Sequence, residues 1–588
     1  MQLRGLELSA AHEWLAHDPF GRPKPADVPA VGAAITDAQG RVTLRAARNG
    51  YVSFRLLVRG RGEFRLSASA TGGLEADLYK AWFHRMHAEA GQQPDWWPDA
   101  LVPVNPTALH RLPDPDNRIK GQNTQEFWVD IFVPPDAEPG VHTVLLRLAA
   151  RGREAALAAR VEVLDHTIPD EPRVTMDYNS YGCRWLADLY PNTLARARSE
   201  KRAWHARIEL LHHYHRIVRE HCGLFHNLGY GHSGAFDPIY GPRIEGRGRT
   251  LQLTAWDRFD RHYGPLLDGR AFAQAAPALP PPRRAPAPIW GVYTPINPDW
   301  PASYLWWGQQ GYEVEFTRGV AQFDHHLRQN GWTSSFIELF FNHKKRYRWF
   351  EWDGDEPKHL KDLAYHQEMI RLWEAATAGS PVKWVYRSDA SWQMKNQFQL
   401  LGGHRNFWVC GGFVKWFSAE LARVLARGEI VWWYNGTPPV QAPSSAILAL
   451  VYETWGRRMH GNCQWLTVQP GPDPWFDCDG ASTGAIYPGE RFGIPGPIPS
   501  IRAKVLRNGI QDIDLLHHDA QAREELTPRV PIPLWQTPPR AARELPPEDW
   551  DSYNLSAEHE PVPQENAALD PFWWQPIRDR ALASEDRP

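Results

Sequence analysis

Three carboxylates lie close together in the segment FEWDGDEPKH (residues 350–359): Asp353, Asp355 and Glu356. Like charges this near one another raise each other's pKa and resist joint burial, so they are either solvated or arranged for chemistry. A pair with one ionised and one protonated carboxyl is what hydrolysis of a glycosidic bond requires. The structural alternative is that these acids only cap the start of a helix.

The flanking sequence places this segment between a strand and a helix. An apolar run, SSFIELFF (334–341), precedes it, and a long helical pattern follows Pro357. Proline suits the first position of a helix, and it favours an extended backbone at the residue before it. Consecutive side chains on a regular strand point to opposite faces, but at a strand-to-helix corner Asp355 and Glu356 can converge on one pocket. We therefore expect a functional Asp-Glu pair at this corner.

Polar and aromatic side chains recur at the ends of the other predicted strands. They supply amides, carboxylates, a guanidinium and aromatic planes, which together resemble a sugar pocket for an oligosaccharide or glycoside. Each one alone could be a hydrogen-bonded core residue, but their shared position favours a common site. With Asp353, the expected substrate-binding residues are Tyr178, Asn179, Asn342, Arg387, Asp389, Trp433, Tyr434, Asn435 and Trp465.

The elements that must position these residues indicate a multidomain protein, because the spacing of apolar residues along the chain differs between its parts. Residues 1–170 alternate apolar and polar positions in short runs joined by turns, which predicts a β-sandwich domain. In residues 171–520, eight apolar runs each precede a helical pattern, which predicts a (β/α)8 TIM barrel with its site at the carboxyl ends of the strands. Residues 521–588 are rich in Pro and acidic residues and lack a period, so we expect a tail over the surface.

The composition is typical of a globular protein in a reducing compartment. Of the 588 residues, 43% are hydrophobic and 23% charged, and the net charge of −3 argues against a polyanion-binding surface. No apolar stretch approaches the roughly 20 residues that span a bilayer, and the first residues lack the apolar region of a signal peptide. The five cysteines are odd in number and widely spread, so they form no disulfide framework. We expect a cytoplasmic protein without nucleic-acid or membrane partners, extracytoplasmic only if a leader is missing from this chain. Homo-oligomerisation stays open.

Tryptophan is unusually abundant, with 29 Trp against 23 Phe and 19 Tyr. Indole faces stack on the C–H faces of sugar rings, and the indole N–H can bond a hydroxyl. A large protein also packs Trp in its cores and domain seams, so the excess is compatible with both uses.

The sequence lacks the motifs that bind common cofactors and metals. The histidine-rich segment 211–221 has no pair with the i, i+4 spacing of H-E-x-x-H, so we expect its histidines to be solvated on a helix. There is no Walker loop, no G-x-G-x-x-G after a strand and no G-x-S-x-G elbow. We therefore expect no cofactor and no metal.

Several stretches resemble glycoside hydrolase family 123, whose known members are exo-acting β-N-acetylgalactosaminidases, and its uncharacterised barrel relatives. They are scattered over residues 95–520, and the most specific contains YPG, PSIR and LRNGIQD (486–516). The others are PDALVPV (98–104), GQNTQEFWVDIFVPPDAEPGVHTVLLRL (121–148), LDHTIPDEP (164–172) and DGDEP (353–357).

The resemblance implies hydrolysis of β-linked N-acetylhexosaminides with retention of anomeric configuration. In such substrate-assisted catalysis Glu356 would protonate the departing glycosidic oxygen and later deprotonate the attacking water. Asp355 would hold the 2-acetamido group, whose carbonyl oxygen attacks C1 in place of an enzyme nucleophile. Adjacent carboxylates suit this reaction because both serve one ring from one side.

Two alternatives stay open. A glycosidase acting on sugars without a 2-acetamido group would use Glu356 as the acid and Asp389 or Asp353 as nucleophile or base. Its carboxyl groups would be about 5 Å apart if retaining and roughly 6.5–9.5 Å apart if inverting. A non-catalytic carbohydrate-binding protein would instead have Glu356 exposed or neutralised by Arg or Lys, without a sugar-sized cavity beside it.

Overall fold

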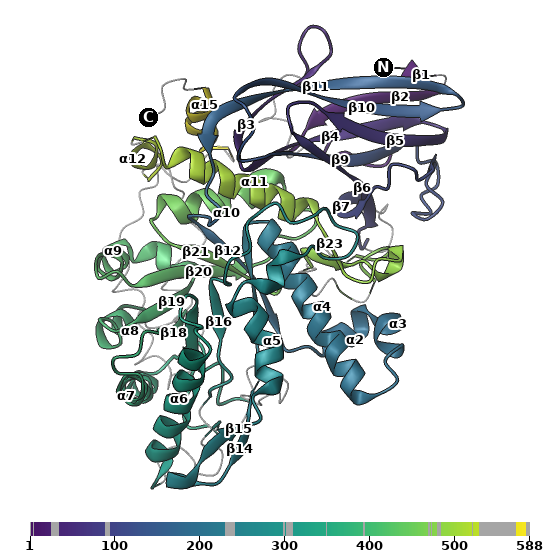
Figure 1. Ribbon diagram of the computed structural model, residues 1–588. Coiled ribbons are helices and arrows are strands. Elements are labelled where there is room, and N and C mark those ends of the chain that lie inside the picture. The colour runs from purple at the N-terminus through teal and green to yellow at the C-terminus, as the bar shows by residue number, and fades with distance from the viewer. Residues whose placement is uncertain are drawn as a thin grey trace.

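A β-sandwich packs against a barrel of strands surrounded by helices (Figure 1). The predicted fold class, a β-sandwich followed by a (β/α)8 barrel, is confirmed. The computed structural model describes residues 2–3, 5–24, 35–88, 95–229, 241–297, 300–301, 310–347, 350–391, 394–468, 471, 473–478, 484–519, 521–527 and 572–583.

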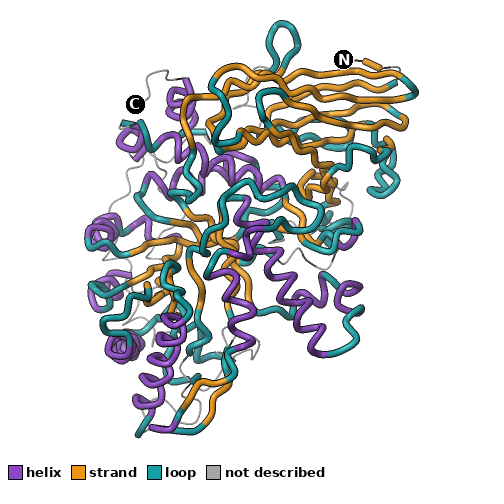
Figure 2. Tube along the Cα trace, in the orientation of Figure 1, coloured by secondary structure: helices purple, strands orange, loops and turns teal. Residues whose placement is uncertain are grey.

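The sandwich is built from two sheets, seen as the upper group of strands in Figure 2. One sheet has the order β1 (Gln2–Leu3), β2 (Leu6–His12), β4 (Gly50–Gly60), β9 (Thr124–Val133), β6 (Glu75–Arg85) and β7 (Trp96–Pro103). The other has the order β3 (Val42–Arg48), β11 (Arg153–Thr167), β10 (Gly140–Ala150), β5 (Gly62–Ala70) and β8 (His110–Leu112). Phe54, Leu56 and Val58 are fully buried between the sheets, as their alternation predicts.

Eight parallel strands form the barrel in chain order. They are β12 (Thr175–Tyr181), β13 (Gly223–Leu228), β16 (Gly291–Tyr293), β17 (Phe336–Phe340), β18 (Lys383–Ala390), β19 (Asn406–Gly411), β20 (Ile430–Gly436) and β21 (Gly461–Trp465). β12 pairs with β21, so hydrogen bonds close the ring except between β13 and β16, which lie side by side. Strands buried on both faces need continuous apolar runs, which is why these segments stood out in the sequence.

Each strand is followed by its helix, and all eight predicted strand–helix pairs are present. The helices are α4 (Glu200–Glu220), α5 (Asp257–Leu267), α6 (Tyr312–Gln329), α7 (Leu360–Ala376), α8 (Met394–Leu400), α9 (Ser418–Ala426), α10 (Ser444–Gly456) and α11 (Ile501–Leu516). Short elements in the loops are α2 (Trp185–Leu189), α3 (Pro191–Ala195), β14 (Arg243–Glu245), β15 (Gln252–Thr254), β22 (Ile486–Pro488), β23 (Pro497–Pro499) and the 3-10 turns η3 (Gly248–Thr250), η4 (Arg270–Ala273), η5 (Gly412–Trp416) and η6 (Glu490–Phe492).

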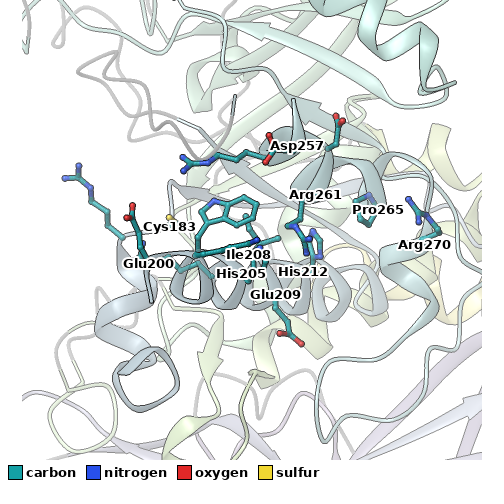
Figure 3. Close-up of a pocket in the computed structure, with 16 residues that line it drawn as sticks. Cys183, Glu200, His205, Ile208, Glu209, His212, Asp257, Arg261, Pro265 and Arg270 are labelled. Atoms are coloured by element: carbon teal, nitrogen blue, oxygen red, sulfur yellow. The ribbon is translucent and has the colours of Figure 1, made fainter. Parts of the chain in front are cut away.

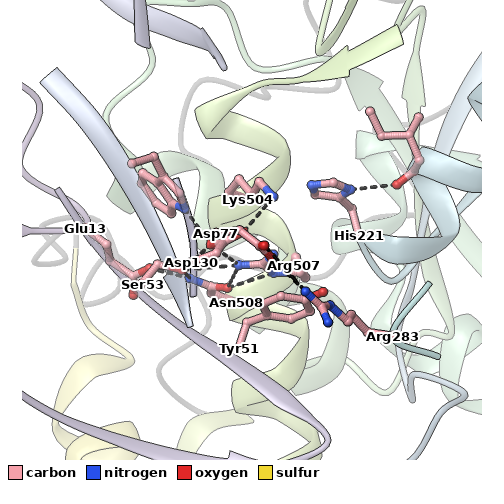
Figure 4. A network of polar contacts seen from close by, with 12 residues as sticks. Glu13, Tyr51, Ser53, Asp77, Asp130, His221, Arg283, Lys504, Arg507 and Asn508 are labelled. Carbon is pink, nitrogen blue, oxygen red and sulfur yellow. Dashed lines mark hydrogen bonds and ion pairs between the residues drawn. The ribbon is translucent and has the colours of Figure 1, made fainter. Parts of the chain in front are cut away.

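Helix α11 lies between the barrel and the sandwich, and all of its residues are buried (Figure 1). Its charged side chains are paired across this seam (Figure 4). Lys504 Nζ lies 2.6 Å from Asp130 Oδ2 of β9, and Arg507 donates to both oxygens of the same carboxylate at 2.8 and 2.9 Å. Burial alone would raise the pKa of Asp130, but the charges of Arg507 and Lys504 outweigh it and hold that pKa well below its usual value. The most specific motif in the sequence therefore joins the two parts of the molecule.

The carboxyl-terminal segment returns to the core at its end. Trp574 is fully buried, and its ring lies 4.5 Å from that of Tyr452 on α10 and 5.3 Å from that of Trp14. Helices α12 (Ala522–Leu526) and α15 (Gln575–Ala583) belong to the predicted tail, and residues 528–571 between them lie outside the described part of the chain. The expectation of a surface tail is wrong for residues 572–583, because the apolar cluster Phe572, Trp573 and Trp574 drives burial despite the acidic, Pro-rich composition around it.

Across the described residues, no helix combines the length and the apolar character needed to cross a bilayer.

Candidate functional site

The acidic segment lies in the loop between β17 and α7, and this loop folds back on itself. The backbone N–H groups of Gly354 and Asp355 both donate to the His343 carbonyl, at 2.9 and 3.1 Å. The His343 ring packs against Phe350 and Trp352, with ring centroids 4.3 and 4.5 Å apart. A Cβ at Gly354 would lie 2.2 Å from the Phe341 carbonyl oxygen, so only glycine allows this close return. The return brings Asp355 and Glu356 beside the end of β17.

The start of α7 differs from the prediction. The helix begins at Leu360, with His359 and Asp362 forming a capping box, so Pro357 lies before the helix and is not its first residue. Glu356 has φ +51, in the left-handed region, where the sequence predicted an extended backbone. The expectation from proline is local, and here the contacts of the folded loop override it.

The carboxylates of Asp355 and Glu356 converge on a single ammonium group. Lys344 Nζ lies 3.2 Å from Asp355 Oδ2 and 2.6 Å from Glu356 Oε2. Because both oxygens contact the same nitrogen, Asp355 Oδ2 and Glu356 Oε2 are no farther apart than the sum of these two distances. The other oxygen of Glu356, Oε1, accepts hydrogen bonds from the Ser391 and Tyr434 hydroxyls.

Burial and charge set the protonation of the groups around this pair. Burial lowers the pKa of Lys344, but attraction to Asp355 and Glu356 outweighs it and raises the pKa above its ordinary value. Burial and the nearby Glu356 charge raise the pKa of Tyr434, so its hydroxyl keeps the proton that it donates to Glu356. Lys344 therefore stays cationic and Tyr434 stays a donor.

A cavity of about 250 Å³ lies beside the pair. Its lining comes from the β17–α7 loop and from strands β12, β18, β19, β20 and β21. Of the residues expected from sequence, the lining includes Asn179, Asp355, Glu356, Arg387, Asp389, Tyr434 and Trp465. The residues that sequence reasoning missed are Tyr181, Lys344, Arg346, Val409 and Cys463.

Two aromatic residues expected at the site face the other way. Tyr178 is fully buried in the core, and a Cβ at Gly223 would meet its ring. Trp433 is buried as well, and its Nε1 donates to Thr454 of α10 at 2.7 Å. Neighbours on a strand alternate between faces, so Asn179 and Tyr434 point into the barrel while Tyr178 and Trp433 point outward. The substrate-binding roles expected for Tyr178 and Trp433 are not compatible with this placement.

Three further residues were expected to bind substrate. Two of them support residues around the cavity without lining it, and the side chain of the third is not described. Asn342 is buried and hydrogen bonds to Tyr181, which lines the cavity. Asp353 accepts the Lys345 backbone N–H at 2.7 Å and shapes the loop without lining the cavity. The side chain of Asn435 lies outside the described residues.

Beneath the cavity, the barrel interior holds a chain of buried charges. Arg387 holds the Asp389 carboxylate through two hydrogen bonds of 2.8 and 3.1 Å. His226 lies 3.2 Å from both Asp177 and Glu338, and Glu338 also lies 3.7 Å from Arg387. The sequence signal for Asp177 was its position two residues before Asn179, on the same face of β12.

These contacts move the pKa values of the buried groups. Burial lowers the pKa of His226, but Glu338 and Asp177 outweigh it and raise the pKa to about 9. Burial raises the pKa of Asp389 to about 6, with Arg387 opposing and the charges of Asp355 and Glu356 adding to the rise. Asp355, Glu356 and Asp389 all line this cavity, so three carboxylates face one space.

The tryptophans in the described part of the chain mostly pack in cores. Ten of them are among the largest fully buried side chains, including Trp352 and Trp408. Trp465 is 43% exposed and lines the cavity, where its ring lies 6.4 Å from that of Tyr181. Among the described tryptophans, Trp465 is the one that lines this cavity and can stack on a sugar ring.

A larger cavity of about 1370 Å³ lies between α4 and α5, away from the acidic pair (Figure 3). Its lining mixes cations and carboxylates of both helices with His205 and His212. His212, His213 and His215 are buried, so the expectation of solvated histidines on this helix is wrong. Within the described residues, no group of three or more His, Cys, Asp or Glu side chains is arranged to hold a metal ion.

Comparison with solved structures finds the same architecture in a glycoside hydrolase. A family 123 glycoside hydrolase from Clostridium perfringens, studied for glycolipid glycan hydrolysis, aligns over 98% of this chain and 97% of its own, with a TM-score of 0.60 and 12% identity. The fold resembles that of family 123. This agrees with the resemblance drawn from the sequence motifs, and at 12% identity it concerns the fold alone.

Other solved structures are more distant. The endo-1,4-β-D-xylanase 10B of Clostridium thermocellum covers 86% of this chain and 93% of its own at 9% identity, with a TM-score of 0.29. The β-glucuronidase 3 of Bacteroides uniformis covers 79% of this chain and 50% of its own at 9% identity, with a TM-score of 0.26. These TM-scores are too low to indicate a shared fold. No protein-family model matches the sequence, and neither does any curated protein.

Proposed function

We propose that this protein is an exo-acting, retaining glycoside hydrolase that cleaves β-linked N-acetylhexosaminides of the N-acetylgalactosamine type by substrate-assisted catalysis. The observation that carries the proposal is the convergence of Asp355 and Glu356 on one ammonium at the edge of a cavity of about 250 Å³. The aromatic rings of Tyr181, Tyr434 and Trp465 line the same cavity, which suits the apolar faces of a sugar. The fold likeness to a family 123 enzyme supports the same reaction class.

In this reaction Glu356 is the general acid and then the general base. It gives a proton to the glycosidic oxygen as the bond from that oxygen to C1 breaks, and later takes a proton from the attacking water. The Ser391 and Tyr434 hydroxyls and the Lys344 ammonium hold its carboxyl in place. Such positioning is what makes proton transfer efficient.

Asp355 accepts the N–H of the substrate's 2-acetamido group. This orients the acetamido carbonyl oxygen toward C1, where it forms a bond as the leaving group departs, and the carboxylate stabilises the positive charge that develops on the resulting ring. Water then opens that ring at C1 with net retention. The enzyme supplies no nucleophile, so no second carboxylate is needed across the sugar.

A second candidate is a glycosidase for sugars without the acetamido group, with Glu356 as acid and Asp389 as nucleophile or base. Asp389 lines the same cavity, and burial raises its pKa to about 6. Asp353 drops out of this alternative because it binds the Lys345 backbone and does not line the cavity. The non-catalytic alternative expected Glu356 beside a cation, as Lys344 provides, but it also expected no sugar-sized cavity there.

A panel of aryl β-glycosides with and without the 2-acetamido group tests the proposal. We expect turnover only of the acetamido substrates, with N-acetylgalactosaminide preferred, and inhibition by a thiazoline that mimics the cyclised acetamido intermediate. Turnover of the plain glycosides without thiazoline inhibition would favour the Asp389 mechanism. No turnover of any member would leave a binding protein and overturn the proposal.

A further inference from the structure

Lys344 occupies the centre of the charges around the cavity. Its side chain is 12% exposed, and its Nζ contacts one oxygen of Asp355 and one of Glu356, at 3.2 and 2.6 Å. The next residue, Lys345, is 34% exposed, lies 3.8 Å from Asp353 and does not line the cavity. Two adjacent lysines thus have different surroundings, although nothing in the sequence separates them.

We propose that Lys344 is a positioning residue that turns Asp355 and Glu356 toward the same side of the cavity and sets the pH range in which the pair works. The inference rests on the proposed function, in which these two carboxyls are the acid–base and acetamido-binding groups.

The first argument is geometric. Adjacent carboxylates repel each other, and side chains of successive residues tend to diverge. Glu356 is held from one side by the Ser391 and Tyr434 hydroxyls through Oε1, and Lys344 contacts Oε2. Asp355 contacts that same ammonium. Lys344 therefore couples the orientation of Asp355 to that of Glu356.

The second argument is the charge of the site. With both carboxyls ionised, the pair and Lys344 together carry a charge of −1, and one proton on Glu356 makes the group neutral. A neutral group is the form that a sugar-filled, water-poor cavity favours, and it has the proton that the first step needs. Without Lys344, the same pair would carry −1 even with one proton bound.

Among the residues that the structure describes, the other titratable groups that face the cavity do not replace this cation. They are Arg346 on the same loop, Arg387 and Asp389 of β18, Tyr434 of β20, Tyr181 of β12 and Cys463 of β21. Arg387 is engaged in two hydrogen bonds with Asp389. Burial raises the pKa of Tyr181, Tyr434 and Cys463, which keeps all three neutral. Arg346 is exposed at the rim, where water screens it.

The test is the dependence of kcat/KM on pH in Lys344→Met, Lys344→Arg and the matched control Lys345→Met. Loss of a cation within 4 Å raises the pKa of a carboxyl, so we expect both limbs of the bell-shaped profile of Lys344→Met to move up by about one pH unit. On the acid limb this is about a tenfold loss of activity. Lys344→Arg should restore the position of both limbs, and Lys345→Met should match the wild type. A profile that is lower but not shifted would overturn the proposal.

A chemical readout separates this inference from the proposed function. Amines react with acetic anhydride in the neutral form, so an ion-paired Lys344 should be acetylated at least tenfold more slowly at pH 8 than Lys345, as measured by mass spectrometry. Glu356→Gln should speed its labelling. If the wild type hydrolyses no glycoside but this labelling pattern holds, the proposed function fails while the charge coupling stands. Equal labelling of both lysines would overturn the coupling itself.

Discussion

Glu356 has a backbone conformation that few residues other than glycine adopt. Its φ of +51 lies in the left-handed region, which costs roughly 1–2 kcal/mol for a residue with a Cβ. The cost is sustained because the residue is held through its side chain by Lys344, Ser391 and Tyr434. Local strain that is held by converging contacts is typical of functional positions.

Replacing the carboxyl of Glu356 tests its role as acid and base. We expect Glu356→Gln to lower kcat on an aryl β-N-acetylhexosaminide by about 10²- to 10⁴-fold, because an amide keeps the shape but transfers no proton. Asp353→Asn should show a milder loss through the loop. Glu351→Gln on the same loop, where an exposed carboxylate accepts the Tyr365 hydroxyl at 2.9 Å, is the control and should leave kcat unchanged. Wild-type rates in Glu356→Gln would remove the assignment.

Trp465 offers an exposed aromatic face at the cavity. Loss of one stacking contact is worth about 0.5–1.5 kcal/mol, so Trp465→Ala should raise KM about three- to tenfold with little change in kcat. Steady-state kinetics on the preferred aryl glycoside measure both constants. Phe20→Ala, at a 37% exposed aromatic in the sandwich, should change neither. A fall in kcat with constant KM would instead place Trp465 in the chemical step.

The sequence correctly predicted that the site lies at the carboxyl ends of the barrel strands. It did not predict which of two neighbouring residues on a strand faces the cavity. Asn179 and Tyr434 line the cavity, whereas their neighbours Tyr178 and Trp433 face the helices, because successive residues alternate and each pair contains two plausible candidates. A lysine four residues beyond a strand carries no pattern of its own, so Lys344 could be recognised only once the loop had folded back.

Among the elements, the strands were easier to predict than the loop that carries the acids. Continuous apolar runs mark strands buried on both faces, and the eight runs are all barrel strands. The loop depends on Gly354 and His343, which are eleven residues apart in the sequence and meet only in the folded chain. Helix α11 was predicted as a helix, but its charged residues become intelligible only with the sandwich packed against it.

The ion pairs of α11 predict a large cost for removing their common carboxylate. Asp130→Asn would leave Lys504 and Arg507 buried without their counter-charge, which costs about 3–5 kcal/mol. The midpoint of urea unfolding should fall accordingly. Asp165→Asn is the control, because its carboxylate is 80% exposed beside Arg48 and such surface pairs are worth less than about 1 kcal/mol. Equal losses in the two variants would show that the seam does not depend on Asp130.

In the molecule as a whole, buried aromatic and charged residues bring together segments that are distant in sequence. Trp574 near the carboxyl end packs on Trp14 and on Tyr452 of α10, and Asp130 of the sandwich binds α11 of the barrel. Most of the tryptophans that the structure describes lie in extensive cores and seams, a use that composition alone could not distinguish from a sugar-binding surface. The same burial takes many histidines out of water.

These histidines predict a loss of stability in mild acid. Burial lowers the pKa of His12 to about 3 and that of His84, His110, His212, His213 and His366 to about 4. It also holds the pKa of His215, His221 and His262 well below its ordinary value. A histidine with a lowered folded pKa stabilises the fold above its unfolded value of about 6.5, and this contribution is lost as the pH falls toward the folded value. His226 has the opposite sign, because its raised pKa of about 9 makes its contribution complete below about 6.5 and lost above 9.

Between pH 6.5 and 4, the described histidines with a lowered pKa outnumber the residues whose protonation stabilises the fold. The main opposition there comes from Glu13 and Asp514, whose pKa burial raises to about 7, and from Asp77 and Asp389, raised to about 6; protonation of these carboxyls favours the fold as the pH falls. Among the described residues, nine histidines with a strongly lowered pKa stand against four carboxyls raised to about 6 or 7, which leaves a net uptake of protons on unfolding, so the Tm should fall between pH 6.5 and 5.

Thermal unfolding at half-unit pH steps measures this fall, and two variants test its source. The ring of His215 contacts Phe225 and His262 and has no hydrogen-bond partner among the described residues, so His215→Phe removes a titrating group with little change of shape. Its Tm should fall less steeply than that of the wild type between pH 6.5 and 5. His404→Gln, at a half-exposed histidine paired with Glu374, should follow the wild-type curve. A wild-type Tm that stays constant from pH 7 to 5 would mean that these histidines gain protons without unfolding, and that their burial is less complete than the packing around them requires.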